Sequence, residues 1–248
     1  MSESHHVRAI ILKRWDYGEK DQIVSFLGEG VGRQQGIAKA SKGSRRRFSG
    51  ALDLFSFSEL RFRERKSSSL VFLEEARLIS AFPGIRSDYN LILLASGLIE
   101  TVYQLYREGS GGEDSSFRIL LESLKALEQG PGKPRGVFWR ALLRHLAVGG
   151  MAPEFSLCVR CREGKGPFAG FEPPAGGMIC MKCAGSSILR LPAPDSLRRS
   201  LLQEDDPDGG LALLSDEDET ALRRILKEHL QFQMNLDLEW DRFFEFVG

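Results

Sequence analysis

Four cysteines in two close pairs carry the clearest chemical pattern of this 248-residue sequence. "CVRC" spans 158–161 and "CMKC" spans 180–183, with 18 residues between the pairs. This is the C-x2-C…C-x2-C spacing of zinc sites. Two thiolates three positions apart can hold one side of a tetrahedral ion, and a second pair returned by a loop closes the other side. We therefore predict one structural Zn²⁺ bound by Cys158, Cys161, Cys180 and Cys183.

Two other interpretations of the cysteines are weaker. Four thiolates fill the coordination shell and leave no position for a water nucleophile, so we do not expect the metal to catalyse a reaction. The first residues, MSESHHVRAI, lack the apolar core of a secretory signal, which favours a cytoplasmic location and disfavours disulfides. The remaining alternative is a cysteine cluster that carries no metal.

A run of positive charge is the second pattern. "GIAKASKGSRRRFSGAL", residues 36–52, contains no acid, and nothing between Glu29 and Asp53 is acidic, although the whole chain balances 34 basic against 34 acidic residues. A segment without compensating acids should repel itself unless an anion neutralises it, and nucleic-acid phosphates are such anions. The cations of this window are Arg33, Lys39, Lys42, Arg45, Arg46 and Arg47. The plain alternative is a solvated surface loop.

Aromatic residues accompany these cations. Lys13, Arg14 and Trp15 follow the first apolar segment, and Phe48 follows the three arginines. Basic grooves with stacking aromatics hold single-stranded nucleic acid without reading its sequence. An equally good interpretation places Trp15 and Phe48 in a hydrophobic core.

No catalytic arrangement stands out. The P-loop pattern is absent, because Gly132–Lys133 is followed by Pro134, and there is no G-x-S-x-G elbow. His145 and His229 each stand alone on predicted helices, where a histidine at the edge of the core is the better interpretation. We predict that the protein is not an enzyme.

The elements that would position these residues follow from periodicity. Five short β segments fill the first eighty residues, which predicts a small closed barrel, either an OB-fold or an SH3-like barrel. In "DLFSFSELRFRE" the apolar phase shifts by one residue after Phe57, as it would at a β-bulge. The basic segment would then be a loop between barrel strands, where OB-folds expose binding loops.

Helical spacing begins after "FPGIR" and continues through most of the remaining chain. We predict an α+β protein: an OB-fold DNA-binding domain over 1–80 and an α-helical domain over 81–248, with a zinc-finger insert at about 156–187. No apolar run approaches the roughly 18 residues of a membrane-spanning helix, so no membrane association is expected.

The blocks "DYGEKD" and "AKASKGSRRRFSGAL", and the cysteine pairs after "LLRHLAVGG", resemble the RecO family of bacterial DNA repair and recombination mediators. The resemblance covers nearly the whole chain. It implies an N-terminal OB-fold, a helical domain and a zinc-finger insert. It further implies a nucleoid-associated protein whose candidate DNA contacts are Lys13, Arg14, Arg33, Lys39, Lys42, Arg45, Arg46 and Arg47.

The same resemblance implies a non-enzymatic function. The family binds single- and double-stranded DNA, anneals complementary strands and joins RecR to load RecA onto strands coated by single-strand-binding protein. It also takes the acidic tail of single-strand-binding protein into its helical domain. Arg140 and Arg144, one turn apart beside an apolar stripe, could receive that tail's carboxylates, or they could simply be solvated.

Two functions of other classes remain as alternatives. An RNA- or ribosome-associated protein with a structural role could carry the same barrel, basic loop and zinc site. A zinc-dependent hydrolase is the weaker alternative, because the predicted cysteine shell is closed.

Overall fold

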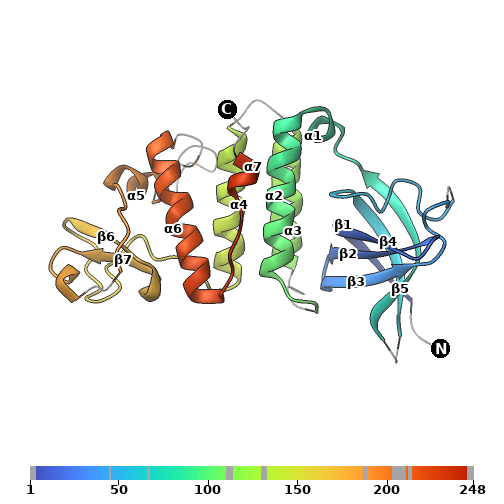
Figure 1. Ribbon diagram of the computed structural model, residues 1–248, viewed down its shortest axis with the longest axis horizontal. Helices are drawn as coiled ribbons and strands as arrows, with labels where there is room; N and C mark the ends of the chain where they lie inside the picture. Colours follow the sequence, from blue (N-terminus) through green and yellow to red (C-terminus); the bar gives the residue numbers. More distant parts are fainter. Residues whose placement is uncertain are drawn as a thin grey trace. The chain divides into compact units, whose positions relative to one another are not determined.

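The computed structural model describes residues 4–44, 46–65, 68–109, 114–129, 133–186, 189–202, 211 and 214–244. Five strands form a closed barrel, and helices follow it in the sequence (Figure 1), as the predicted α+β class requires. The chain divides into two compact units, Met1–Pro131 with Asp241–Gly248 and Gly132–Trp240. The predicted domain limits at 80 and 81 describe a change of fold type and stay a prediction.

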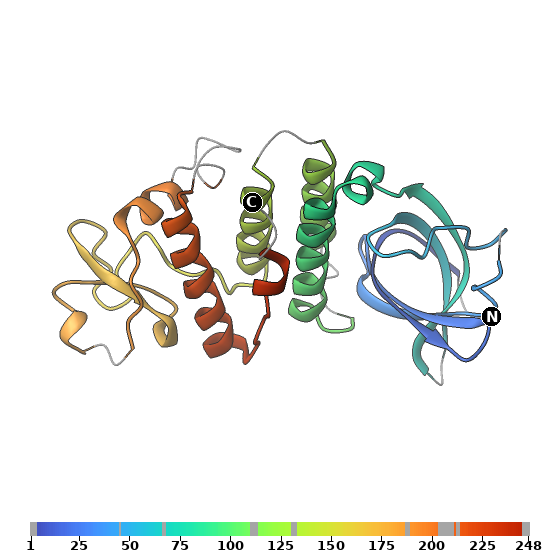
Figure 2. The same cartoon turned by 45° about the horizontal axis from the view of Figure 1, so that its top comes forward.

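The barrel has the strand order β1-β2-β3-β5-β4, closed by pairing of β4 with β1. All neighbours are antiparallel except β3 and β5, which run parallel, and Figure 2 shows the closed ring. This OB-like topology agrees with the first of the two predicted barrel types. The strands are β1 Ser4–Tyr17, β2 Asp21–Gly28, β3 Gly32–Ala38, β4 Phe57–Arg65 and β5 Ser68–Ser80.

Alternating apolar residues fill the barrel. Ile11, Phe26, Leu60 and Leu73 lie in one core cluster and are almost completely buried. The predicted bulge is present, since the pairing of β4 with β5 shifts register between Phe57 and Ser58. Where β3 meets β5 only glycine fits at position 36, because a Cβ there would lie 2.9 Å from Leu73 Cγ.

Helices α1–α3 and α7 belong to the same unit as the barrel. Asp88 caps α2, accepting hydrogen bonds from the backbone N–H groups of Asn90 and Leu91. Both α2 and α3 contact β1. The helices that the structure describes in this unit are α1 Pro83–Ser87, α2 Tyr89–Leu105, α3 Asp114–Gln129 and α7 Asp241–Phe244.

The second unit combines helices with a two-stranded sheet. Its aromatic centre contains Trp139 and Trp240, whose ring centroids lie 5.6 Å apart in an edge-to-face arrangement. Ser215 caps α6, whose first turn carries four acids at the positive end of the helix dipole. The elements are α4 Pro134–Val148, β6 Phe168–Glu172, η1 Pro173–Ala175, β7 Gly177–Cys180, η2 Ala184–Ser186, α5 Asp195–Leu201 and α6 Asp216–Met234.

Among the described residues, no helix combines the length and the apolar character needed to cross a membrane.

Candidate metal centre and nucleic-acid interface

The four cysteines come together at one point of the second unit. Their Sγ atoms all lie within 4.8 Å of one another, and those of Cys161 and Cys180 are 3.7 Å apart. Zinc–sulfur bonds of about 2.3 Å in a tetrahedron place sulfurs about 3.8 Å apart. None of the four thiols forms a disulfide. The cluster therefore fits a four-coordinate metal ion, as the spacing predicts.

Local backbone geometry directs the four thiols toward one another. The carbonyl oxygen of Cys158 accepts from the backbone N–H of Arg162 (2.8 Å), and that of Cys180 accepts from the backbone N–H of Cys183 (3.1 Å). Arg162 has a positive φ of 61°, which reverses the chain immediately after Cys161. The Cys180 backbone N–H points to Cys158 Sγ at 3.4 Å. Each C-x2-C pair is thus a tight turn with both sulfurs on one side.

The pKa values of two of the thiols are shifted in opposite directions. Burial raises the pKa of Cys158, but hydrogen bonds from backbone N–H groups outweigh it and lower that pKa to about 6. The pKa of Cys183 is raised to about 12, first by its side-chain hydrogen bond with Cys180 and then by burial. Four adjacent thiols cannot all ionise beside one another, whereas a bound cation would favour four thiolates.

Two arginines that the motif did not indicate hold this cysteine module (residues 154–183) together. Arg160 pairs with the buried carboxylate of Glu172 through two guanidinium nitrogens. From α5, Arg198 donates to the carbonyl oxygens of Phe155, Ser156 and Gly164. Its guanidinium also lies 4.4 Å from the ring centre of Phe168. The module is therefore fixed to a helix of its own unit.

The basic loop, residues 39–56, joins β3 to β4, and hydrogen bonds hold several of its described residues against the barrel. The Arg47 carbonyl oxygen accepts from Ala76 of β5 (2.8 Å), and the Ala51 carbonyl oxygen accepts from Ser58 Oγ (2.7 Å). Phe48 is buried in the barrel core, which decides between its two sequence interpretations. Trp15 is only partly buried and packs edge-on against Tyr103 of α2.

Acids from other segments neutralise much of the loop. Lys39 pairs with Asp21 at 2.6 Å and Lys42 with Asp16 at 3.1 Å, both acids flanking the β1–β2 turn. A third pair runs the other way, from Asp53 of the loop to Arg14 of β1. The expectation that the segment lacks compensating acids is therefore wrong, because it considered only neighbours in sequence.

These ion pairs help to lower the pKa of two carboxyl groups. The pKa of Asp16 is lowered, chiefly by its hydrogen bond with Lys42. That of Asp21 is lowered by the Ala40 backbone N–H and by Lys39. Both acids therefore remain charged opposite their lysines at neutral pH.

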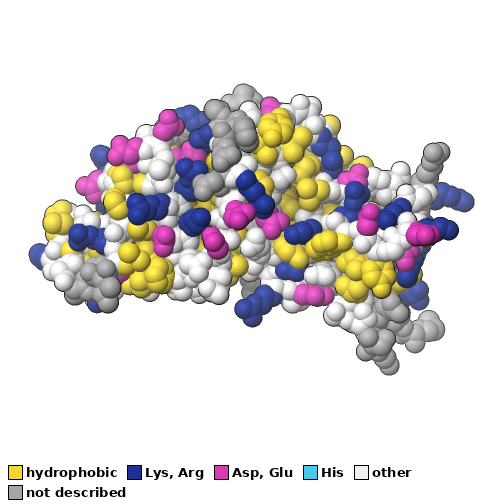
Figure 3. All heavy atoms as spheres, in the orientation of Figure 1, with side chains coloured by type: hydrophobic (Ala, Val, Ile, Leu, Met, Phe, Trp, Pro, Cys, Tyr) yellow, Lys and Arg dark blue, Asp and Glu magenta, His cyan; other side chains and the backbone are white. Residues whose placement is uncertain are grey.

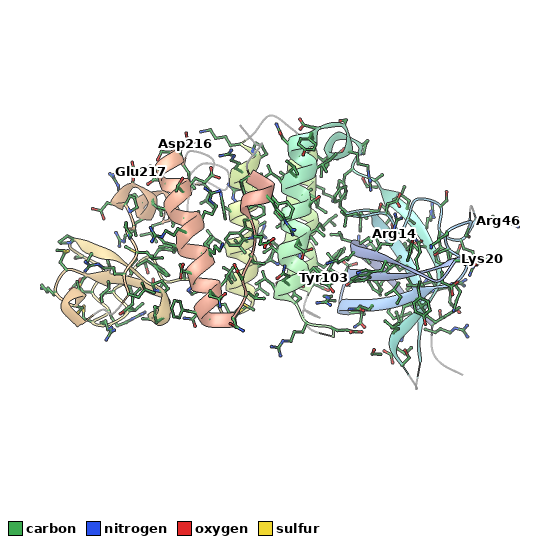
Figure 4. The ribbon with its side chains drawn as sticks, in the orientation of Figure 1. Arg14, Lys20, Arg46, Tyr103, Asp216 and Glu217 are labelled. Atoms are coloured by element: carbon green, nitrogen blue, oxygen red, sulfur yellow. The ribbon has the colours of Figure 1, made fainter. Side chains whose placement is uncertain are left out.

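Arg46 and Arg47 differ from the paired cations. Arg47 donates to the Lys39 carbonyl oxygen and lies over the Phe48 ring. Arg46 is exposed and, within the described part of the chain, forms no ion pair. It projects with Lys20 from the end of the barrel in Figure 4, and Figure 3 shows basic and acidic side chains mixed over that end. Arg45 lies outside the described residues.

Lys13 and Arg33 lie apart from this loop, against α2. The Arg33 guanidinium donates to the carbonyl oxygens of Tyr103 (2.8 Å) and Tyr106 (2.6 Å) and stacks 4.1 Å from the Tyr103 ring centre. Lys13 contacts the same ring and approaches Glu100 at 3.7 Å. The seven predicted DNA contacts that the structure describes therefore do not form one cluster.

The helical candidates occupy α4 and α6. Arg140 is half-buried and Arg144 exposed, one turn apart on α4. His145 and His229 are both buried. Burial lowers the pKa of His145 to about 3 and also lowers that of His229, so both imidazoles are neutral at pH 7.

The family model described as "Recombination protein O N terminal" matches residues 1–82, and "Recombination protein O C terminal" matches 86–239. The chain belongs to the RecO family. Its RecO relatives include the DNA repair protein RecO of Anaeromyxobacter sp. (strain Fw109-5), 32% identical over 100% of this chain and 98% of the relative.

Other relatives match in part. The DNA repair protein RecO of Desulfatibacillum aliphaticivorans is 34% identical over 71% of this chain and 69% of its own length. That of Nocardioides sp. (strain ATCC BAA-499 / JS614) is 32% identical over 76% and 78%. The resemblance to the RecO family seen in the sequence is thus confirmed.

Proposed function

We propose that this protein is a recombination mediator. It binds single- and double-stranded DNA, anneals complementary strands and, with RecR, helps to load RecA onto strands coated by single-strand-binding protein. The observation that carries the proposal is the match of both RecO family models along nearly the whole chain. The OB-like barrel with a basic loop supplies a physical reason for the DNA binding.

The basic loop and its neighbour Arg14 form the proposed DNA interface. Arg46 is exposed and has no ion-pair partner among the described residues, whereas Lys39 and Lys42 share their charge with aspartates. Arg47 and Arg45 complete the proposed loop contacts. A DNA contact by Lys13 or Arg33 would compete with their bonds to α2.

One structural Zn²⁺ is the proposed occupant of the cysteine cluster. Cysteine thiolates suit this ion, and the four sulfurs fill a tetrahedral shell. The ion would hold the two turns together and, because no position is left for water, would not act on a substrate. We accordingly propose a non-enzymatic role, exercised at the nucleoid in the cytoplasm.

Arg140 and Arg144 are the proposed receivers of the acidic tail of single-strand-binding protein. They lie on one face of α4 beside the residues of its buried stripe, so an apolar acidic peptide could place its carboxylates on them. Arg144→Glu should weaken binding of a synthetic tail peptide and leave binding of naked DNA unchanged.

Strand annealing tests the mediator proposal. Complementary oligonucleotides, each coated with single-strand-binding protein, are mixed with and without the purified protein, and duplex formation is followed by fluorescence. We expect acceleration by the wild type, a loss in Arg46→Glu, and little change in Lys125→Glu, a matched charge reversal at an exposed position of α3. No acceleration by the wild type would contradict mediation and favour an RNA-associated role, which binding to structured RNA would then reveal.

A further inference from the structure

A pocket of about 600 Å³ opens beside the basic loop, entirely within the barrel unit. Its volume falls within the range of about 300–1,000 Å³ typical of small-ligand sites. Its walls come from β1, β2 and the loop, and are Arg14, Gln22, Ser41, Lys42, Gly43, Ser44, Phe48, Ser49, Gly50, Leu52 and Asp53.

The lining is mainly polar and is rigidly supported. Ser41 and Gln22, both buried, hydrogen bond to each other through Ser41 Oγ and Gln22 Oε1 at 3.0 Å. Ser44 Oγ accepts from the Arg47 backbone N–H, and Ser56 Oγ donates to the Gly50 carbonyl oxygen. A pocket already ordered before binding loses less conformational entropy when a ligand enters. Serine hydroxyls are donors that suit an anionic oxygen.

Two cations line the pocket, and each is held by an aspartate. Lys42 meets Asp16, whose side chain is 71% exposed, and Arg14 meets Asp53, whose side chain is 46% exposed. Ion pairs this exposed contribute little to stability, so a competing anion can replace the carboxylates at small cost. The aspartates thus orient Lys42 and Arg14, but they bind weakly enough for a phosphate to displace them.

We propose that this pocket binds one phosphodiester, with its attached sugar, of a nucleic-acid strand. Lys42 and Arg14 contact the phosphate, and the hydroxyls of Ser44 and Ser49 contact its oxygens or the sugar. Asp16 and Asp53 hold the two cations while no strand is bound. This rests on the proposed DNA binding, and adds to it a defined pocket and an exchange of ion-pair partners.

Gly43 allows the pocket to be blocked without disturbing the fold. A Cβ at this position would meet no heavy atom within 4 Å, and its φ lies outside the left-handed range. Gly43→Glu adds a negative charge to the pocket, and Gly43→Gln adds the same volume without the charge. Gly185→Glu, also a glycine with open space around it but in the other unit, controls for net charge.

The measurement is the affinity for a fluorescent oligothymidylate at fixed salt. We expect Gly43→Glu to weaken binding about tenfold, Gly43→Gln by less, and Gly185→Glu hardly at all. Asp16→Asn should strengthen binding roughly two- to threefold, because Lys42 loses its competitor. In ¹⁵N spectra, the amides of Gly43, Ser44 and Gly50 should shift when a thymidine dinucleotide is added.

The outcomes separate this pocket from the proposed function. If the wild type binds DNA and Gly43→Glu binds equally well, the pocket is overturned while DNA binding stands. Weakening in Gly185→Glu equal to that in Gly43→Glu would also overturn the pocket, because net charge alone would then explain the loss. A wild type that binds neither single- nor double-stranded DNA overturns the proposed function itself.

Discussion

The cysteine module and the basic loop obtain their chemical partners from different places. In the module, all four candidate ligands lie within the two C-x2-C pairs, and their sulfurs converge as the spacing predicts. In the loop, the acids that oppose Lys39 and Lys42 come from elsewhere in the chain, and the loop's own Asp53 pairs with Arg14 of β1. A motif that contains all its participants can be interpreted from sequence. A run of charged residues cannot be interpreted in this way, because its ion-pair partners depend on the tertiary structure.

The same contrast applies to single arginines. Arg198 is bonded to three carbonyl oxygens of the module, whereas Arg46 is exposed at the end of the barrel (Figure 4). Buried or shared donors act mainly on stability, while exposed cations act mainly on binding. Four predictions test this division.

The largest effect is expected for Cys180→Ser. A structural zinc contributes on the order of 10 kcal/mol to folding of a small module, and three remaining thiolates hold the ion less tightly. We expect loss of one bound zinc per chain and unfolding of the module, measured by metal analysis and limited proteolysis.

Met181→Ser is the matched control for that change, because Met181 is adjacent and its side chain is exposed. It should retain the metal and the wild-type protease resistance. Wild-type protein purified without chelators that contains no zinc, with all four thiols free, would contradict the metal assignment.

Arg198→Met should be the next most damaging change. It removes hydrogen bonds to three carbonyl oxygens and the contact with the Phe168 ring while keeping much of the side-chain volume. A loss of about 3 kcal/mol in the free energy of unfolding is expected, measured by chemical denaturation. Arg199→Met should cost under about 0.5 kcal/mol, since Arg199 is exposed and its described hydrogen bond goes to a carbonyl of its own helix. Equal losses would show that Arg198 does not fix the module.

Much of the fold was predictable because it depends on local patterns. Alternation gave the five strands and the bulge after Phe57, and the two C-x2-C pairs gave the cysteine site. The missed features all depend on distant partners. Arg198 meets carbonyls at 155, 156 and 164, and Arg33 meets those of Tyr103 and Tyr106. No periodicity or composition identifies a backbone carbonyl as the partner of an arginine.

The third prediction concerns acid stability of the second unit. His145 is buried with a folded pKa of about 3, while an unfolded histidine titrates near 6.5. Between these values the unfolded chain binds the extra proton, so the stability present above about pH 6.5 is lost progressively as the pH falls toward 3. The expected slope is up to about 1.4 kcal/mol per pH unit.

His145→Gln isolates this contribution, because glutamine does not titrate. The unfolding free energy of the wild type should fall relative to that of the variant between about pH 7 and about pH 5.5, a range that limits protonation of the zinc-binding thiolates, measured by denaturation of the zinc-loaded proteins. A difference independent of pH would mean that His145 can accept a proton in the folded state at little cost.

The smallest effects are expected in the basic loop, where they compare Lys39, which is paired, with Arg46, which forms no ion pair with any residue that the structure describes. Arg46→Ala should weaken binding of duplex DNA a few-fold, make the slope of log K against log salt concentration less negative by about 0.9, and change stability by less than about 0.5 kcal/mol. Lys39→Ala should alter the slope less. Asp21 also accepts from the Ala40 backbone N–H, which keeps this carboxylate beside Lys39, so the lysine neutralises less of a phosphate's charge.

Salt titrations of both variants on the same oligonucleotide decide the comparison. If Lys39→Ala changes the slope as much as Arg46→Ala does, the Lys39–Asp21 ion pair must break when DNA binds. DNA phosphates would then replace the aspartates throughout the loop and not only at the pocket. If Arg46→Ala leaves the slope unchanged, exposure and lack of an ion pair do not identify a phosphate contact. The charge that matters would then lie with the cations that line the pocket, Lys42 and Arg14.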